Sequence, residues 1–239
     1  MVAALIAWQQ FILPFGAIAV GRALGLDPEI VLFIVVTLTS GSLFASPTLV
    51  QLMGLDQRIA VQAVVLSTLA APFSIFLFFS FLFAGPVDLD LAKFAERLFF
   101  FLALPLGVLA LVRHFIRHWS ETKKDRLDRV GRWGAVISLA AFCFALEHQV
   151  RLHIAEELDK IFYFLFIALA TASVVAISTR LVLGYFGGRA AATGALLATF
   201  RNVGLTFGLV GAFAGPDVAL YVGVSQIPMF CAPLFFDLF

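Results

Sequence analysis

The chain alternates between long apolar stretches and short polar connections, and eight of the stretches have the length and composition of membrane elements. About 20 apolar residues span a bilayer as a helix, and lipid cannot satisfy the backbone groups of an open strand. The pattern therefore predicts an all-α, polytopic helical membrane protein. The predicted elements are roughly Val2–Leu24, Ile30–Met53, Gln57–Phe83, Arg97–Arg117, Gly131–Val150, Lys160–Gly184, Ala191–Ala214 and Val218–Phe236.

Polar residues interrupt two of these elements. Ile30–Met53 contains Ser40-Gly41-Ser42 followed by Ser46-Pro47-Thr48, and Ala191–Ala214 contains Arg201-Asn202. Broken apolar segments at corresponding places in two halves of a chain indicate a transporter site near the bilayer midplane. We therefore expect two discontinuous helices that cross inside the protein.

The residues at the breaks also predict where each helix restarts. Serine favours an N-cap and proline the first helical turn, so Ser46 is expected to cap one half-helix. Asn202 is expected to cap another that begins at Val203. Both restarted half-helices would point free backbone N–H groups at the centre of the protein, where they favour anions.

The order of the elements predicts an inverted repeat within a single membrane domain, residues 1–239. Three successive elements form a first core trio (residues 1–83), and three others form a second (158–239). Each trio consists of a helix, a broken helix and a helix, and the two trios enter the membrane from opposite sides. Panel-type helices and loops occupy residues 84–157. Because two elements precede only the second trio, we expect a matching N-terminal pair to be missing, through truncation or because a partner supplies that surface.

Loop charge predicts the orientation. Basic residues gather on one side of the membrane, most densely between Arg113 and Arg132, and acidic residues on the other. The positive-inside bias then places both termini in the cytoplasm, and we expect a bacterial inner (plasma) membrane. The basic loop is interpreted as a topology signal and not as a nucleic-acid patch.

Composition agrees with this class and narrows the chemistry. The chain is 62% hydrophobic and 13% charged, whereas a soluble domain has about a quarter charged residues. Its two cysteines lie in apolar segments and predict neither a disulfide framework nor a metal site. No paired carboxylates or Ser-His-Asp set share a predicted pocket, so we expect no enzyme activity and no cofactor.

Arg201 is the only formal charge deep inside a predicted membrane element. An ionisable residue there is costly and indicates a functional site. With no Asp or Glu in the interior, a carboxylate, sulfonate or phosphate group of a cargo could pair with it. Backbone carbonyls freed at the breaks could satisfy it equally well, and the nearby hydroxyls could serve helix packing alone. The candidate cargo-binding residues are Arg201, Asn202, Ser46, Thr48, Thr199 and Ser42.

Three stretches resemble the bile acid:sodium symporter (BASS, or SBF-like) family. They are Trp8–Pro14 (WQQFILP), Ser42–Pro72 and Ala198–Leu209 (ATFRNVGLTFGL). The resemblance covers nearly the whole chain as helices three to ten of a ten-helix fold. It implies a core domain built from the two trios and a panel domain built from the other helices.

The chain departs from the sodium-coupled members of that family. In the second interrupted segment, those members carry a Glu and a Gln-Asn pair. At the matching positions this chain has Leu197 and Arg201-Asn202. In the first interrupted segment those members have a Ser-Asn pair, where this chain has Ser46-Pro47. At two positions of the next helix where they offer hydroxyl ligands, this chain has Ala60 and Val64.

Only Gln9, Ser46 and Asn202 match ion-site positions of the family. A guanidinium repels a neighbouring sodium ion, so we expect the standard sodium sites to be lost and Arg201 to stand in for the bound cation. Sodium as a coupling ion is therefore doubted, and no other cofactor is expected.

These observations favour a secondary transporter that moves a small organic anion by alternating access. Three alternatives stay open: a sodium-coupled bile-acid-type symporter, a related efflux carrier, and a non-transporting sensor or scaffold of the same fold. The expected partners are the lipid bilayer and a small anionic solute, and a homo-oligomer stays open.

Overall fold

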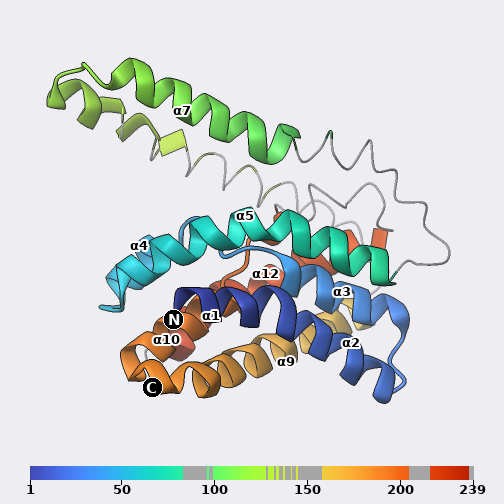
Figure 1. Cartoon of the computed structure of the whole chain (residues 1–239). Coiled ribbons are helices and arrows are strands. Elements are labelled where there is room, and N and C mark those ends of the chain that lie inside the picture. The colour runs from blue at the N-terminus through green and yellow to red at the C-terminus, as the bar shows by residue number, and fades with distance from the viewer. Residues whose placement is uncertain are drawn as a thin grey trace.

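A computed structural model describes residues 1–82, 99–127, 158–204 and 216–236, with residue 96 and short pieces between 129 and 144. These residues form helices and turns, with one isolated β-bridge between two extended segments. The all-α prediction is confirmed. Figure 1 shows long helices lying side by side, with the short α4 beside one end of α5.

The first trio begins with one continuous helix that contains a π-helical turn. Its parts are α1 (Val2–Ala7), the π-helix η1 (Trp8–Ile12) and α2 (Leu13–Ala23). A π-turn widens the helix locally and often marks a functional position. Here Gln9 and Gln10, although adjacent in the sequence, are both fully buried.

The second element of the trio is broken, as predicted, into α3 (Pro28–Thr39) and α4 (Ser46–Leu52). Helix α3 ends because Ser40 is extended (φ −65°, ψ 142°). The predicted Ser46 N-cap is wrong: Ala45 occupies the N-cap position and Ser46 is the first helical residue, with no capping hydrogen bond from its side chain. Helix α5 (Gln57–Leu82) completes the trio.

The second trio begins with α9 (Leu158–Leu183), followed by the 3₁₀ turn η3 (Gly184–Phe186) and α10 (Gly188–Thr199). The chain is extended at Arg201 and helical again at Val203–Gly204. The rest of the predicted element up to Ala214 lies outside the described residues. Helix α12 (Pro216–Phe236) completes the trio.

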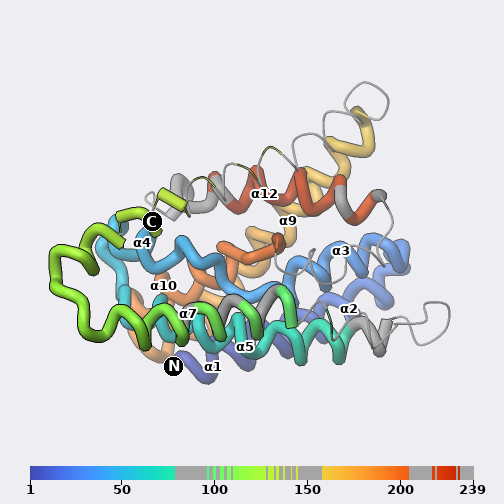
Figure 2. The backbone as a smooth tube through the Cα atoms, turned by 90° about the horizontal axis from the view of Figure 1, so that it is seen from above, coloured from blue at the N-terminus to red at the C-terminus, as the bar shows by residue number. Residues whose placement is uncertain are grey.

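The two trios pack together around shared apolar clusters. One cluster joins α3 and α5 to α9 and α12, and in it the Phe33 ring stacks on Tyr221 at 5.2 Å and meets Phe164 edge-on at 5.2 Å. A second cluster joins α1, α4 and α5 to α9, α10 and α12. Figure 2 shows the α3–α4 segment and α10 crossing near the middle of the molecule.

Three described helices have the length and apolar composition to cross a membrane: Val2–Ala23, Gln57–Phe78 and Leu158–Phe186. Their outer faces carry exposed large apolar side chains such as Phe73 and Leu181. The protein is therefore an integral membrane protein.

Helix α7 (Leu104–Ile116), which follows the π-helix η2 (Phe99–Ala103), lies apart from the labelled helices of the trios in Figure 1. The predicted element Gly131–Val150 falls largely outside the described residues. The panel assignment of residues 84–157 therefore stays a prediction, as does the cytoplasmic position of both termini.

Candidate functional site: the crossing of two discontinuous helices

The extended segments between the half-helices pair with each other. The Leu43 N–H donates to the Phe200 carbonyl at 2.9 Å, and the Asn202 N–H donates to the Gly41 carbonyl at 2.6 Å. These two bonds flank the antiparallel bridge between Ser42 and Arg201. The breaks free backbone groups that would otherwise be unpaired inside the protein, and the crossing satisfies part of them.

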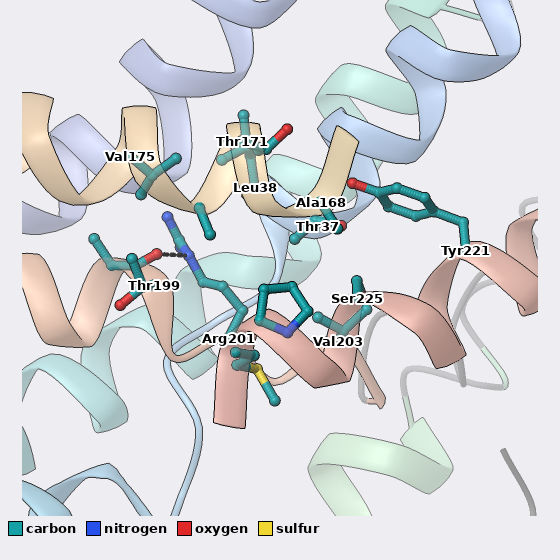
Figure 3. A pocket seen from close by; sticks show the side chains of 14 residues that line it. Thr37, Leu38, Ala168, Thr171, Val175, Thr199, Arg201, Val203, Tyr221 and Ser225 are labelled. Carbon is teal, nitrogen blue, oxygen red and sulfur yellow. Dashed lines mark hydrogen bonds between the residues drawn. The ribbon is translucent and has the colours of Figure 1, made fainter. Parts of the chain in front are cut away.

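The Arg201 side chain is buried at this crossing, with 2% of its surface exposed. Its guanidinium donates three hydrogen bonds to backbone carbonyls, from Nε to Ala198 at 2.6 Å, from Nη1 to Ser40 at 3.0 Å and from Nη2 to Gln9 at 3.4 Å. Figure 3 shows the first of these bonds. Within the described part of the chain, no carboxylate lies within ion-pair distance of it. A guanidinium has five N–H donors, so two remain beyond these three bonds.

This arrangement matches the second interpretation that the sequence leaves open, in which backbone carbonyls freed at the breaks satisfy Arg201. The carbonyls of Ala198 and Ser40 belong to the two broken helices, and that of Gln9 belongs to the π-helical turn. Their dipoles stabilise the guanidinium, but they carry no net charge. The site therefore retains a buried positive charge without a counter-charge among the described residues.

The side-chain amide of Gln10 also binds the first break and helix α5. Its Nε2 donates to the Ser40 carbonyl at 3.3 Å and to the Ser67 carbonyl at 3.4 Å, and its Oε1 accepts from Ser74 Oγ at 2.8 Å. The Ser40 carbonyl thus accepts hydrogen bonds from both Gln10 and Arg201. Sequence reasoning missed Gln10, although a glutamine pair inside an apolar span was a usable signal, because buried amides need partners within the protein.

Small residues allow the first crossover to approach α5 closely. The Ser42 N–H donates to Ser67 Oγ at 2.9 Å. A Cβ atom at Gly41 would lie 3.2 Å from backbone atoms of Ser67 and Thr68. Since the obstacles are backbone atoms of a helix, a side chain at residue 41 would push the crossing away from α5.

The structure brings some of the predicted cargo-binding residues together. Ser42 and Asn202 lie beside Arg201 at the crossing, but Ser42 Oγ donates to the Leu197 carbonyl at 3.2 Å. Thr199 Oγ1 likewise donates to carbonyls of its own helix, at 2.9 and 3.1 Å. Thr48 is exposed on α4.

The first restarted half-helix does not present the free backbone donors that the sequence predicts. The Ser46 N–H donates to the Leu43 carbonyl, and the N–H groups of Thr48 and Leu49 both donate to Ala45. Pro47 has no N–H. The expectation of an anion-binding N-terminus at α4 is therefore wrong.

The positions that match ion ligands in the bile acid:sodium symporter family carry both polar and apolar side chains. The Gln9 amide and the Ser46 hydroxyl are fully buried, and neither has a hydrogen-bond partner among the described residues. Leu197 and Ala60 are also fully buried, and Val64 is 6% exposed. Two polar groups thus keep unused hydrogen-bonding capacity, whereas three positions that could supply ion ligands are apolar.

A small cavity of about 30 Å³ lies between α3, α9, α10 and α12. Thr199 and Arg201 line it, together with Tyr221, whose hydroxyl lies near the side chains of Thr37 and Thr171 but makes no hydrogen bond there (Figure 3). This volume holds about one or two water molecules. In this conformation the cavity cannot hold an organic anion.

The crossed discontinuous helices and the apolar spans define the class as a polytopic helical membrane protein with transporter architecture. Residues 1–157 match the model of the sodium bile acid symporter family, and the chain belongs to that family. This confirms the family resemblance at Trp8–Pro14 and Ser42–Pro72, whereas Ala198–Leu209 lies outside the matched range. The matched range ends before α9, so Arg201 lies outside it. No curated protein matches the chain.

Proposed function

We propose that this protein is a secondary transporter that moves a small organic anion by alternating access and lacks the standard sodium sites. The observation that carries the proposal is the buried guanidinium of Arg201, which bonds three backbone carbonyls at the crossing and has no carboxylate partner among the described residues. In a transporter, the role of such a charge would be to bind an anionic cargo, which neutralises it.

In this proposal, Arg201 takes the place of a sodium ion at the same carbonyls. Carbonyl oxygens are the ligands that hard cations prefer, and here Arg201 already occupies three of them. A sodium ion about 4 Å from the guanidinium would be repelled by about 4 kcal/mol at an intermediate effective dielectric constant. Leu197, at the position of the family's Glu, provides no negative charge to offset this repulsion.

The cargo would approach the two remaining guanidinium N–H donors. The proposed neighbours are Asn202, next to Arg201 in the chain, and Thr199, which lines the same cavity. Ser46 contributes a buried hydroxyl that has no partner among the described residues. Thr48 and Ser42 are weaker candidates, because Thr48 is exposed and Ser42, whose hydroxyl is bonded to the Leu197 carbonyl, is not among the residues that line the cavity beside Arg201. Since the cavity beside Arg201 is too small for an organic anion, binding requires a more open conformation.

One observation favours a second candidate, a sodium-coupled symporter. The Gln9 amide and the Ser46 hydroxyl are buried and have no hydrogen-bond partner in the part of the chain that the structure describes, and both match ion-site positions of the family. Burying such groups without partners costs free energy, about 1–3 kcal/mol each, which a bound ion would recover. Sodium titration separates the two candidates.

The proposal is tested by thermal unfolding of the purified protein with a panel of potassium salts of small carboxylates, sulfonates and phosphate esters. At least one anion should raise the unfolding temperature of the wild type, and Arg201→Gln should abolish that shift. Arg180→Gln, which changes an exposed arginine on α9, is the matched control and should retain it. Full retention of the shift in Arg201→Gln would reject Arg201 as the cargo-binding charge.

The remaining assignments follow from the same proposal. We place the protein in a bacterial inner membrane with both termini in the cytoplasm, as the loop charges predict. It acts on a solute without changing it chemically, so it is not an enzyme.

A further inference from the structure

The charge at the crossing is permanent, and this restricts how a carrier built around it can cycle. An arginine side chain stays protonated in proteins, and unlike a bound sodium ion it cannot leave. A coupling ion is released together with the cargo, so its charge is absent when the empty carrier returns. Here the positive charge of Arg201 remains in the empty carrier.

The surroundings of Arg201 make this charge costly whenever the site is closed to water. Apolar residues of both clusters flank it on its own segment, with Leu197 and Phe200 on one side and Val203 on the other. The adjoining cavity has room for only one or two waters. Three carbonyls stabilise the guanidinium, but an uncompensated charge still carries a desolvation penalty in such an environment.

Alternating access requires a state in which the site is closed to both sides. With an anion bound, that state encloses a neutral pair of charges. Without an anion, it encloses a guanidinium that backbone carbonyls stabilise but that has no counter-charge among the described residues. The barrier to reorientation is therefore lower for the loaded carrier than for the empty one, because only the loaded carrier has the counter-charge in place.

We infer that the protein is an anion exchanger, in which the outward and inward movements of the carrier each require a bound anion. This inference rests on the proposed transport function. It adds that net uptake into an anion-free compartment is slow and that an anion on the opposite side accelerates it. The exchanged solutes are small monovalent organic anions, since one negative charge neutralises one guanidinium.

The experiment uses the purified full chain in liposomes. A small-molecule extract of cells grown on ¹³C-labelled carbon is placed outside, and the vesicles contain either the same extract unlabelled or a sucrose buffer without organic anions. Mass spectrometry measures which labelled anions enter. For at least one anion, the initial rate should be at least tenfold higher with internal anions, which corresponds to a barrier difference of about 1.4 kcal/mol.

Equal rates into both sets of vesicles would overturn the exchange inference and leave the proposed transport function intact. Entry into neither set would reject the transport function and the inference with it. Arg201→Gln removes the permanent charge, so it should bring the two rates to within about twofold of each other if it still transports. Arg180→Gln should keep the wild-type ratio. A wild-type ratio in Arg201→Gln would also overturn the inference.

Discussion

Arg201 donates a hydrogen bond from Nη1 to the carbonyl oxygen of Ser40 at 3.0 Å. This bond links the interrupted segment of the second trio to the interrupted segment of the first. Ser40 ends α3 of the first trio, and Arg201 follows α10 of the second. A side chain that binds both breaks couples their positions, and any movement of one segment relative to the other must change this bond. The fixed charge is thus a structural part of the crossing as well as a candidate site for an anion.

The first prediction concerns the stability that Arg201 provides. Arg201→Ala removes three charge-assisted hydrogen bonds and leaves the carbonyls of Ala198 and Gln9 without this donor. We expect the free energy of unfolding in detergent to fall by about 2–4 kcal/mol. Arg180→Ala, on the exposed face of α9, should change it by less than about 0.5 kcal/mol. Equal effects of the two substitutions would contradict the assigned role of the carbonyl network.

The adjacent glutamines should respond in opposite ways. Gln10→Leu removes hydrogen bonds to Ser40, Ser67 and Ser74 and should lower the free energy of unfolding by about 1–3 kcal/mol. Gln9→Leu replaces a buried amide that has no partner among the described residues and should leave stability unchanged or raise it. The pair is compared by thermal unfolding in sodium-free buffer. A loss in Gln9→Leu as large as in Gln10→Leu would mean that the Gln9 amide has a partner.

Gly41 should tolerate no side chain. The Cβ of Gly41→Ala would meet backbone atoms of Ser67 and Thr68 at 3.2 Å, so we expect a loss of about 1–3 kcal/mol. Gly16→Ala in α2 is the control: nothing lies within 4 Å of its Cβ, and helix propensity predicts a gain of about 0.5–1 kcal/mol. Thermal unfolding of both variants measures the difference, and a neutral Gly41→Ala would place the crossover farther from α5 than described.

Sodium binding should be recoverable by restoring the family's residues. The double variant Leu197→Glu, Arg201→Gln supplies a carboxylate and removes the guanidinium, while Gln9 and Ser46 provide oxygens that have no partner within the described part of the chain. We expect sodium to raise its unfolding temperature saturably and potassium to have no such effect. Arg201→Gln alone lacks the carboxylate and should respond much less. If the double variant is folded but insensitive to sodium, the apolar positions Ala60 and Val64 are the remaining obstacle.

Within the described residues, the sequence predicted the bounds of most elements of the two trios to within a few residues, because long apolar runs interrupted by glycine, serine and proline leave few alternatives. It also predicted that Arg201 lies at the crossing. It did not predict the hydrogen bonds that hold the guanidinium, since their acceptors are backbone carbonyls that every residue carries. The role of Gln10 depends on a π-helical turn, whose position is set by packing and not by local propensity. The Ser46 N-cap failed because the turn before α4 closes one residue earlier.

The central claim is that the guanidinium of Arg201 takes the place of a dissociable cation. The most direct measurement is a sodium titration of the purified wild-type protein by thermal unfolding, with choline and potassium chloride at matched ionic strength and with a stabilising anion present. We expect sodium, potassium and choline to give the same unfolding temperature at every concentration. Saturable stabilisation by sodium alone would contradict it.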